Sequence, residues 1–281
     1  MIKTFCEKFG YPKEAKEQFS AVYEKVLADG AARSEIYDIM DTFFMGADES
    51  YIPKLDALAQ RLGVRAMALY MVFFIMSEKA IEYIYNMKGY SGIYFDTVRD
   101  TYYKCEECFK MYGFWGTHCL GWFGNYAKCN LFALGRLQFQ PYIAPWDKEG
   151  YVKAGDTVYA VHIPSGAPLK YEDVLASLDE ACAFFGKKEA VFSCHSWLLY
   201  PPQCEMYAPG SNLKKFAELF DIIESNDTNE DLWRVFMTPD CSDTSKLTAT
   251  SSLSEKILAR LKEGKTMGQG LGFIKYTPGI L

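Results

Sequence analysis

Four consecutive residues with reactive or polar side chains lie near the end of one expected strand: Ser193, Cys194, His195 and Ser196. Successive side chains of a strand point to opposite faces, so Cys194 and His195 point away from each other. A thiol nucleophile needs a base beside it. Cys194 would therefore need a partner from elsewhere in the chain, and His118 and His162 are the other histidines.

His195 is the first candidate for a general base, because imidazole titrates near neutral pH. His162 and Glu205 are the alternatives. A positioned base typically raises a rate by about 10² to 10⁴. The competing interpretation is that these polar side chains only form hydrogen bonds where two central strands part.

The turn Pro164–Pro168 is a second candidate site, because it joins an expected strand to a helix that begins near Tyr171. Backbone N–H groups in such a turn, together with the partial positive charge of a helix start, can bind a phosphate. A plain strand-to-helix connection is the alternative. The sequence contains neither GxGxxG nor GxxxxGK[ST], so it carries no dinucleotide fingerprint and no P-loop.

Cysteine spacing does not predict a metal site. Cys105 and Cys108 form one CxxC on an expected helix, without a second pair at the distance of a zinc site. Asn212 follows Pro209-Gly210-Ser211 and is of a type that caps helices.

Apolar residues three and four apart, with Gly or Asn at the stops, predict a helical first part of the chain. We expect an all-α domain over residues 1–113. Its predicted helices are Tyr11–Asp29, Ala32–Phe44, Asp48–Leu62, Val64–Asn86 and Ser91–Met111.

After Gly113 the pattern changes to short β-branched and aromatic runs between turn signals. The expected strands are Leu131–Ile143, Thr157–Ile163, Ala190–Leu198, Leu232–Met237 and Gly272–Tyr276. The expected helices are Tyr171–Phe185, Asn212–Ser225 and Ser252–Lys262. This alternation predicts a mixed α/β domain over residues 114–281 with some parallel pairing, so that the fold class is α+β with two domains. Thr157–Ile163 and Ala190–Leu198 are apolar on both faces and should be central strands.

Composition narrows the class of function. The chain has 281 residues, 49% of them hydrophobic, and a net charge of −6 without a basic segment, which argues against nucleic-acid binding. Nine scattered cysteines and an opening segment without a signal pattern predict a cytoplasmic protein. The longest apolar stretch, Ala66 to Met76, spans about 11 residues where a membrane span needs about 20, so we expect a buried helix and no membrane association.

Several motifs in order resemble a family of bacterial acyltransferase-domain proteins, in which a helical N-acyltransferase domain precedes a GNAT-like domain. The motifs are LGRLQFQP (134–141), VHIPSGAPL (161–169), the helix Ala176–Phe185 with ACAFF, FSCHSWLLYP (192–201) and GSNLKKFAELFDI (210–222). These motifs together cover about residues 130–240. The helical half matches in length and class rather than by motif.

The resemblance implies a transferase that passes an acyl group from acyl-CoA to an amine. In that fold two central parallel strands splay apart, and the pantetheine arm lies in the gap against exposed strand backbone. Here the splayed pair would be Thr157–Ile163 and Ala190–Leu198, and a backbone N–H near Ile163 would hold the oxyanion. Ser165, Gly166 and Ala167 would take the pyrophosphate, and Asn212 would begin the helix beside the thiol end of CoA.

The sequence departs from the family pattern at two places. Only Gly166 remains of the usual Q/R-x-x-G-x-G/A phosphate loop. The helix that should carry a tyrosine to protonate the leaving thiolate offers Phe216, Glu218 and Phe220, so Tyr200, Tyr207 or Cys194 would have to substitute. Gln138 and Gln140 share one face of a strand. They would either line the acceptor site or form a solvent-facing polar stripe.

Three functions follow in order of preference. The first is an acyl-CoA-dependent N-acyltransferase. The second is a GNAT-like module that has lost catalysis and binds a small molecule or partner. The third is a Cys or Ser hydrolase built on Cys194.

Overall fold

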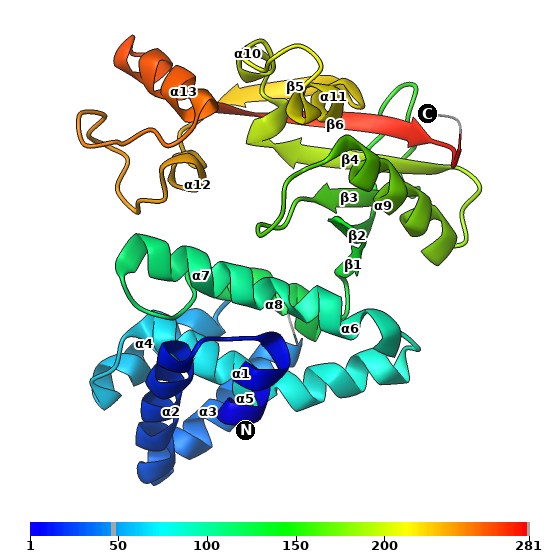
Figure 1. Cartoon of the computed structure of the whole chain (residues 1–281). Helices are drawn as coiled ribbons and strands as arrows, with labels where there is room; N and C mark the ends of the chain where they lie inside the picture. Colours follow the sequence, from blue (N-terminus) through cyan, green and yellow to red (C-terminus); the bar gives the residue numbers. More distant parts are fainter. Residues whose placement is uncertain (46–48, 280–281) are drawn as a thin grey trace. The chain divides into compact units, whose positions relative to one another are not determined.

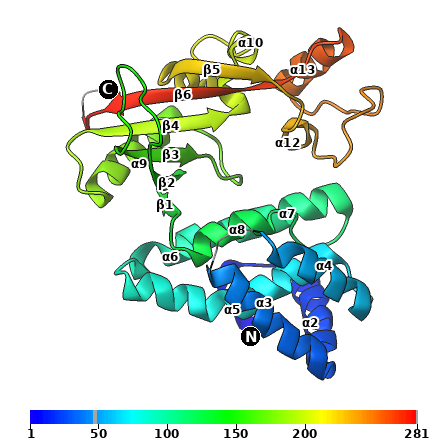
Figure 2. The same ribbon diagram turned by 180° about the vertical axis from the view of Figure 1, so that it is seen from behind.

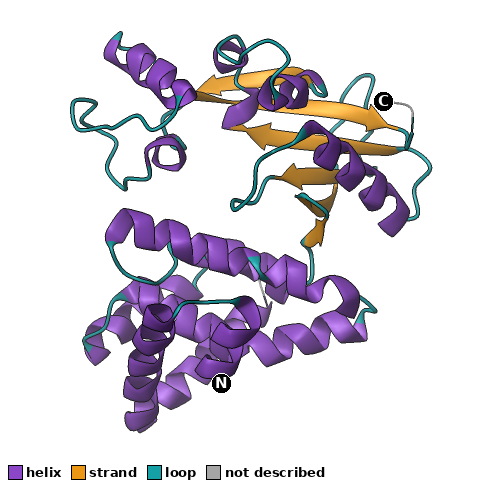
Figure 3. Cartoon of the chain, in the orientation of Figure 1, coloured by secondary structure: helices purple, strands orange, loops and turns teal. Residues whose placement is uncertain are grey.

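The computed structural model describes residues 1–45 and 49–279. The chain forms two compact units, Met1–Phe132 and Ala133–Leu281. Figures 1 and 3 show that the first consists of helices and the second of a sheet with helices, as the sequence predicts.

The helical unit is organised around one long buried helix, α5. Its helices are α1 (Ile2–Phe9), α2 (Lys13–Ala28), α3 (Gly30–Met45), α4 (Tyr51–Leu62), α5 (Ala66–Met87), α6 (Ser91–Val98), α7 (Asp100–Tyr112) and α8 (Leu120–Ala127). α2, α4 and α8 pack against α5, whose apolar residues from Leu69 to Ile75 are buried. The expected helix 91–111 is divided at Arg99, and the expected start of another at Asp48 lies outside the described residues.

The helical unit extends beyond the expected boundary at Gly113. Phe123 of α8 meets Phe74 of α5 with ring centroids 4.9 Å apart, and the Tyr126 hydroxyl donates to Asp100 at 2.8 Å. The aromatic residues Phe123 and Tyr126 therefore contribute to the helical core.

Within the described residues, no single helix combines the length and apolarity needed to cross a membrane. α4 and α5 would satisfy that test only if joined, and they are bent by 113°.

The second unit contains a six-stranded sheet in the order β1-β2-β3-β4-β6-β5. Its strands are β1 (Phe132–Leu134), β2 (Leu137–Ile143), β3 (Thr157–His162), β4 (Ala190–Ser196), β5 (Asp221–Asp227) and β6 (Gly268–Tyr276). β3 and β4 pair in parallel, while β2 with β3, β4 with β6 and β5 with β6 are antiparallel. Both views of the chain show β6 inserted between β4 and β5 (Figures 1 and 2).

The helical segments of this unit are α9 (Tyr171–Phe184), the 3₁₀ turn η1 (Trp197–Leu199), α10 (Pro201–Cys204), α11 (Asn212–Glu218), α12 (Leu232–Phe236) and α13 (Ser252–Lys262). Three predictions were wrong here. The expected strand Leu131–Ile143 is divided into β1 and β2 at Gly135 and Arg136. The expected strand Leu232–Met237 is helix α12, which ends at Phe236 and is followed by Met237 in the left-handed conformation with φ 47°. The expected helix Asn212–Ser225 stops at Glu218, because the chain from Asp221 pairs with β6 as an edge strand.

Both faces of the sheet are covered over part of their area. On the α9 face, Tyr159 stacks on Phe185 at 4.3 Å, and the Tyr276 hydroxyl donates to Asp179 at 2.7 Å. On the opposite face, residues near Ala144 and Val152 fold over Val158 and Phe273. Polar side chains, among them Gln140, His162 and Ser193, lie on the rest of that second face.

Candidate functional site

The two central strands part near their carboxyl ends. Their parallel register comprises Tyr159 against Phe192 and Ala160 against Ser193. Beyond it, β3 runs on to His162 beside β2, and β4 runs on to Ser196 beside β6. Each strand thus keeps its outer neighbour, and the inner edges of the two strand ends diverge. The expected pair of central parallel strands is confirmed.

The chain bends sharply where β4 ends. Ser196 caps η1 by accepting from the Leu198 N–H at 3.1 Å. The Tyr207 hydroxyl donates to the Leu198 carbonyl at 2.9 Å, and this fixes the segment that follows. η1 can lie directly on β6 because Gly270 has no side chain: a Cβ there would lie 2.1 Å from the Leu199 carbonyl oxygen.

One face at the parted ends is polar. Gln138 pairs with His162 and Gln140 with Ala160 in the register, and cross-strand partners share a face. His162 Nε2 lies 3.1 Å from Gln140 Oε1. Ser193 of the next strand also belongs to this face, where its hydroxyl lies 3.2 Å from that of Tyr142. Two positions further along β4, His195 faces the same way.

His162 and His195 occupy different environments on that face. Burial lowers the pKa of His162 to about 4, so its imidazole is neutral at pH 7 and a weak base. His195 is exposed near the end of β4. An exposed imidazole at the parting point can reach a substrate, which makes His195 the better candidate for a general base.

Cys194 lies in the core on the other face of the sheet. Its exposed fraction is 1%, and burial raises the pKa of its thiol to about 12. Its strand neighbour Phe192 packs against Phe139 and Tyr276 on that face. Buried cysteines of this kind are unreactive. Cys194 therefore lies on the opposite face of the sheet from His162 and His195. The third histidine, His118, belongs to the helical unit.

The turn after β3 is held by Arg136, a residue of the LGRLQFQP segment to which the sequence pattern assigns no role. Gly166 has φ 99°, a left-handed conformation that favours glycine. Arg136, between β1 and β2, donates from Nη2 to the Ala167 carbonyl at 2.7 Å and from Nε to the Pro168 carbonyl at 3.1 Å. Ile163 and Ser165 precede this contact and are partly exposed.

Asn212 does not cap its own helix. Ser211 does so, because its hydroxyl accepts from the Lys214 N–H at 3.3 Å. Asn212 Oδ1 instead accepts from the N–H of Tyr171, the first residue of α9, at 3.2 Å. The starts of α9 and α11 are thus joined, and Lys215 Nζ lies 5.4 Å from the centroid of the Tyr171 ring.

The candidate proton donors already have partners. Tyr200 donates to Asp227, and Tyr207 donates to the Leu198 carbonyl while burial raises its pKa. The phenols therefore act in structural hydrogen bonds.

Glu205, an alternative candidate for the general base, is exposed at the end of α10, on the segment that follows β4.

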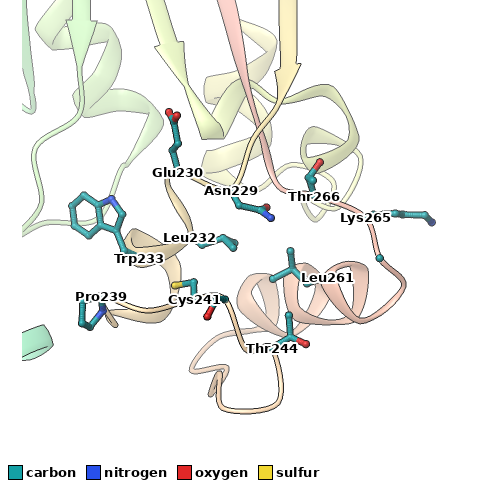
Figure 4. A pocket seen from close by; sticks show the side chains of 12 residues that line it. Asn229, Glu230, Leu232, Trp233, Pro239, Cys241, Thr244, Leu261, Lys265 and Thr266 are labelled. Carbon is teal, nitrogen blue, oxygen red and sulfur yellow. The ribbon is translucent and has the colours of Figure 1, made fainter.

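A cavity of about 470 Å³ lies elsewhere in this unit, between α12, the loop after it and the end of α13 (Figure 4). Trp233, Cys241, Leu261 and Lys265 are among its lining residues. The lining contains none of the described residues that the sequence singled out. We therefore locate the candidate site at the parted strands, where backbone and polar side chains converge.

Within the described ranges, no group of three or more His, Cys, Asp or Glu side chains is arranged to hold a metal ion.

Comparisons with known proteins agree with the two-unit architecture. Residues 1–129 match the model of the N-acyltransferase N-terminal domain, and residues 131–274 match that of the GNAT-like C-terminal domain. No curated protein sequence matches the chain.

Two solved structures share the fold. One is an acyltransferase mutant in complex with octanoyl-CoA, at 21% identity and a TM-score of 0.77. The other is an acyltransferase in complex with decanoyl-CoA and teicoplanin, at 20% identity and a TM-score of 0.74. Each alignment covers 97% of this chain and 87% of the other.

Proposed function

Because the chain belongs to the family that joins an N-acyltransferase N-terminal domain to a GNAT-like C-terminal domain, we propose that it transfers an acyl group from acyl-CoA to an amine. The observation that supports this most directly is the parting of β3 and β4, the sheet's parallel pair. A gap between two strand edges offers backbone donors and acceptors to the pantetheine amides of CoA.

The reaction would proceed by direct attack of the amine on the thioester carbonyl. A C–N bond forms, the C–S bond breaks, and the amine proton passes to a base while the CoA thiolate leaves and takes a proton from water. His195 is the proposed base because it is exposed on the polar face at the parting point. A backbone N–H near Ile163 is the proposed oxyanion donor.

The proposed acceptor is an amine, as the name of the N-terminal domain suggests. The polar face beside His195, where Gln140 is partly exposed, is the proposed contact surface for it; Gln138 and Ser193 belong to the same face but are buried. Solved structures of the same fold contain octanoyl-CoA and decanoyl-CoA, so these two thioesters are the donors to test first.

Ligand-dependent melting tests the proposal. A ligand at about 100 times its dissociation constant stabilises a folded protein by roughly 2.7 kcal/mol, which shifts the melting temperature measurably. We expect CoA and octanoyl-CoA to raise the melting temperature, and release of free thiol when an amine mixture is added. Adenosine and free octanoate serve as controls for nonspecific binding.

The outcomes separate the alternatives. Binding of octanoyl-CoA without thiol release for any amine would favour a binding module. The absence of any shift at millimolar CoA would reject the proposed function. Thioester hydrolysis that Cys194→Ala abolishes would instead support the hydrolase.

A further inference from the structure

The turn Pro164–Pro168 contains no basic side chain, although it is the proposed pyrophosphate site. Its last carbonyls are contacted by the guanidinium of Arg136, which is 31 residues from Ala167 in the sequence. Its fork of N–H groups reaches two successive carbonyls, Ala167 and Pro168, at 2.7 and 3.1 Å. Arginine suits such a two-point contact because its guanidinium donors are held in one plane.

This contact fixes the orientation of the last two carbonyls of the turn. In a trans peptide the carbonyl and the following N–H point in opposite directions. The Pro168 carbonyl faces Arg136, so the Leu169 N–H points away from it. Without Arg136 the carbonyl oxygens could rotate outward, and they would repel an anion.

Arg136 is itself held in place by α9. Its backbone N–H donates to Ser177 Oγ at 2.7 Å, and this hydroxyl donates to the Asp173 carbonyl at 2.7 Å. A Cβ on Gly135 would lie 2.7 Å from the same Ser177 oxygen, so the hairpin fits closely against the helix. The hairpin, the turn and the first turns of α9 thus form one connected group.

We propose that Arg136 is a positioning residue for the donor: it holds the turn Pro164–Pro168 in the conformation that accepts the pyrophosphate of CoA. This inference rests on the proposed function. Arg136 acts through the turn and does not touch the reacting atoms.

Two donors of different length test the proposal. Octanoyl-CoA contains the pyrophosphate, and S-octanoyl-pantetheine lacks it. For Arg136→Ala we expect KM for octanoyl-CoA, and Kd for CoA, to rise about tenfold, as the loss of one or two charge-assisted hydrogen bonds would produce. We expect kcat to stay within about twofold, and the kinetics with S-octanoyl-pantetheine to match those of the unaltered protein.

Arg136→Lys separates the contact from the charge. Lysine keeps the charge but lacks the planar fork, so we expect it to recover less than half of the lost affinity. Lys188→Ala, in the loop between α9 and β4, removes one exposed positive charge and should leave both donors unaffected. Melting temperatures of all variants establish that they are folded.

Equal losses with both donors would overturn the inference, because they would indicate a general effect on the fold. Unchanged CoA affinity in Arg136→Ala would overturn it as well. Full recovery in Arg136→Lys would also overturn it, because the positive charge alone would then account for the effect. If the unaltered protein binds neither CoA nor octanoyl-CoA, the proposed function fails and this inference fails with it.

Discussion

Cys194 and His195 are neighbours in the chain, but the alternation of β4 places them in opposite environments. The thiol lies in the core, and the imidazole lies on the exposed polar face. Chemistry at this position therefore depends on which face the substrate reaches.

Replacing His195 by Ala should lower kcat at least about tenfold, because the amine would lose the proposed acceptor of its proton. Since His195 is exposed, the melting temperature and CoA affinity should hardly change. Steady-state kinetics with octanoyl-CoA measure the loss. A variant with full kcat would remove His195 from the mechanism.

His162 should make the folded protein sensitive to mild acid. Its folded pKa of about 4 lies below its ordinary value of 6.5, so the unfolded chain binds more protons between these pH values. Its contribution to stability is complete above pH 6.5 and is lost progressively as the pH falls toward 4.

Urea unfolding at pH 7 and pH 4.5 measures this effect. His162→Gln should lose less stability over that interval than the unaltered protein, because glutamine does not titrate. Parallel losses in the two proteins would show that the imidazole is not held neutral by the fold.

At the scale of elements, β6 depends on glycine where η1 crosses it. Gly270→Ala would place a methyl group 2.1 Å from the Leu199 carbonyl oxygen, and backbone cannot move aside easily. We expect a destabilisation of about 1–3 kcal/mol, typical of overpacking.

Gly92→Ala in α6 is the matched control, since a Cβ there meets nothing within 4 Å. A solvent-facing helix position should gain up to about 1 kcal/mol from alanine. Chemical denaturation measures the free energy of unfolding of each variant. Equal values for Gly270→Ala and Gly92→Ala would contradict the packing of η1 on β6.

Elements with a clear local pattern were predicted well from the sequence. α13 has the expected bounds, Ser252–Lys262, and α9 and the two central strands agree within two residues. The short run Leu232–Met237 was mistaken for a strand because periodicity cannot separate a short apolar helix from a strand. β5 was missed because its pairing with β6 is a backbone interaction that its exposed polar side chains do not reveal.

The candidate site was predicted only in part. The alternation of side chains along a strand is a local rule, and it predicts which residues share a face at the strand ends. The contacts of Arg136 with the turn and of Asn212 with Tyr171 join residues 31 and 41 positions apart. No local rule specifies such pairs, because they depend on how the hairpin and helices pack.

At the scale of the whole molecule, none of the nine cysteines, all of which lie within the described residues, forms a disulfide, and six of them are buried. Burial raises the pKa of Cys6 to about 11 and that of Cys108 to about 12, which further suppresses their thiolates. We expect a thiol reagent at pH 8 to modify rapidly at most Cys119, Cys204 and Cys241, which are partly exposed.

Reaction with all nine cysteines should follow only after denaturation. Counting the modified thiols by mass spectrometry, before and after adding guanidinium, tests this. Rapid labelling of Cys194 in the native protein would contradict its placement in the core.

The parted strands also bear on how the sequence is free to vary. A sheet that is open between two of its strands can be completed by a ligand that serves as a substitute strand and reads peptide groups instead of side chains. Such a slot demands little of the residues around it, because every amino acid supplies nearly the same backbone. That tolerance is in keeping with a fold retained at 21% identity. Differences between members of the family should then concentrate where the acceptor binds.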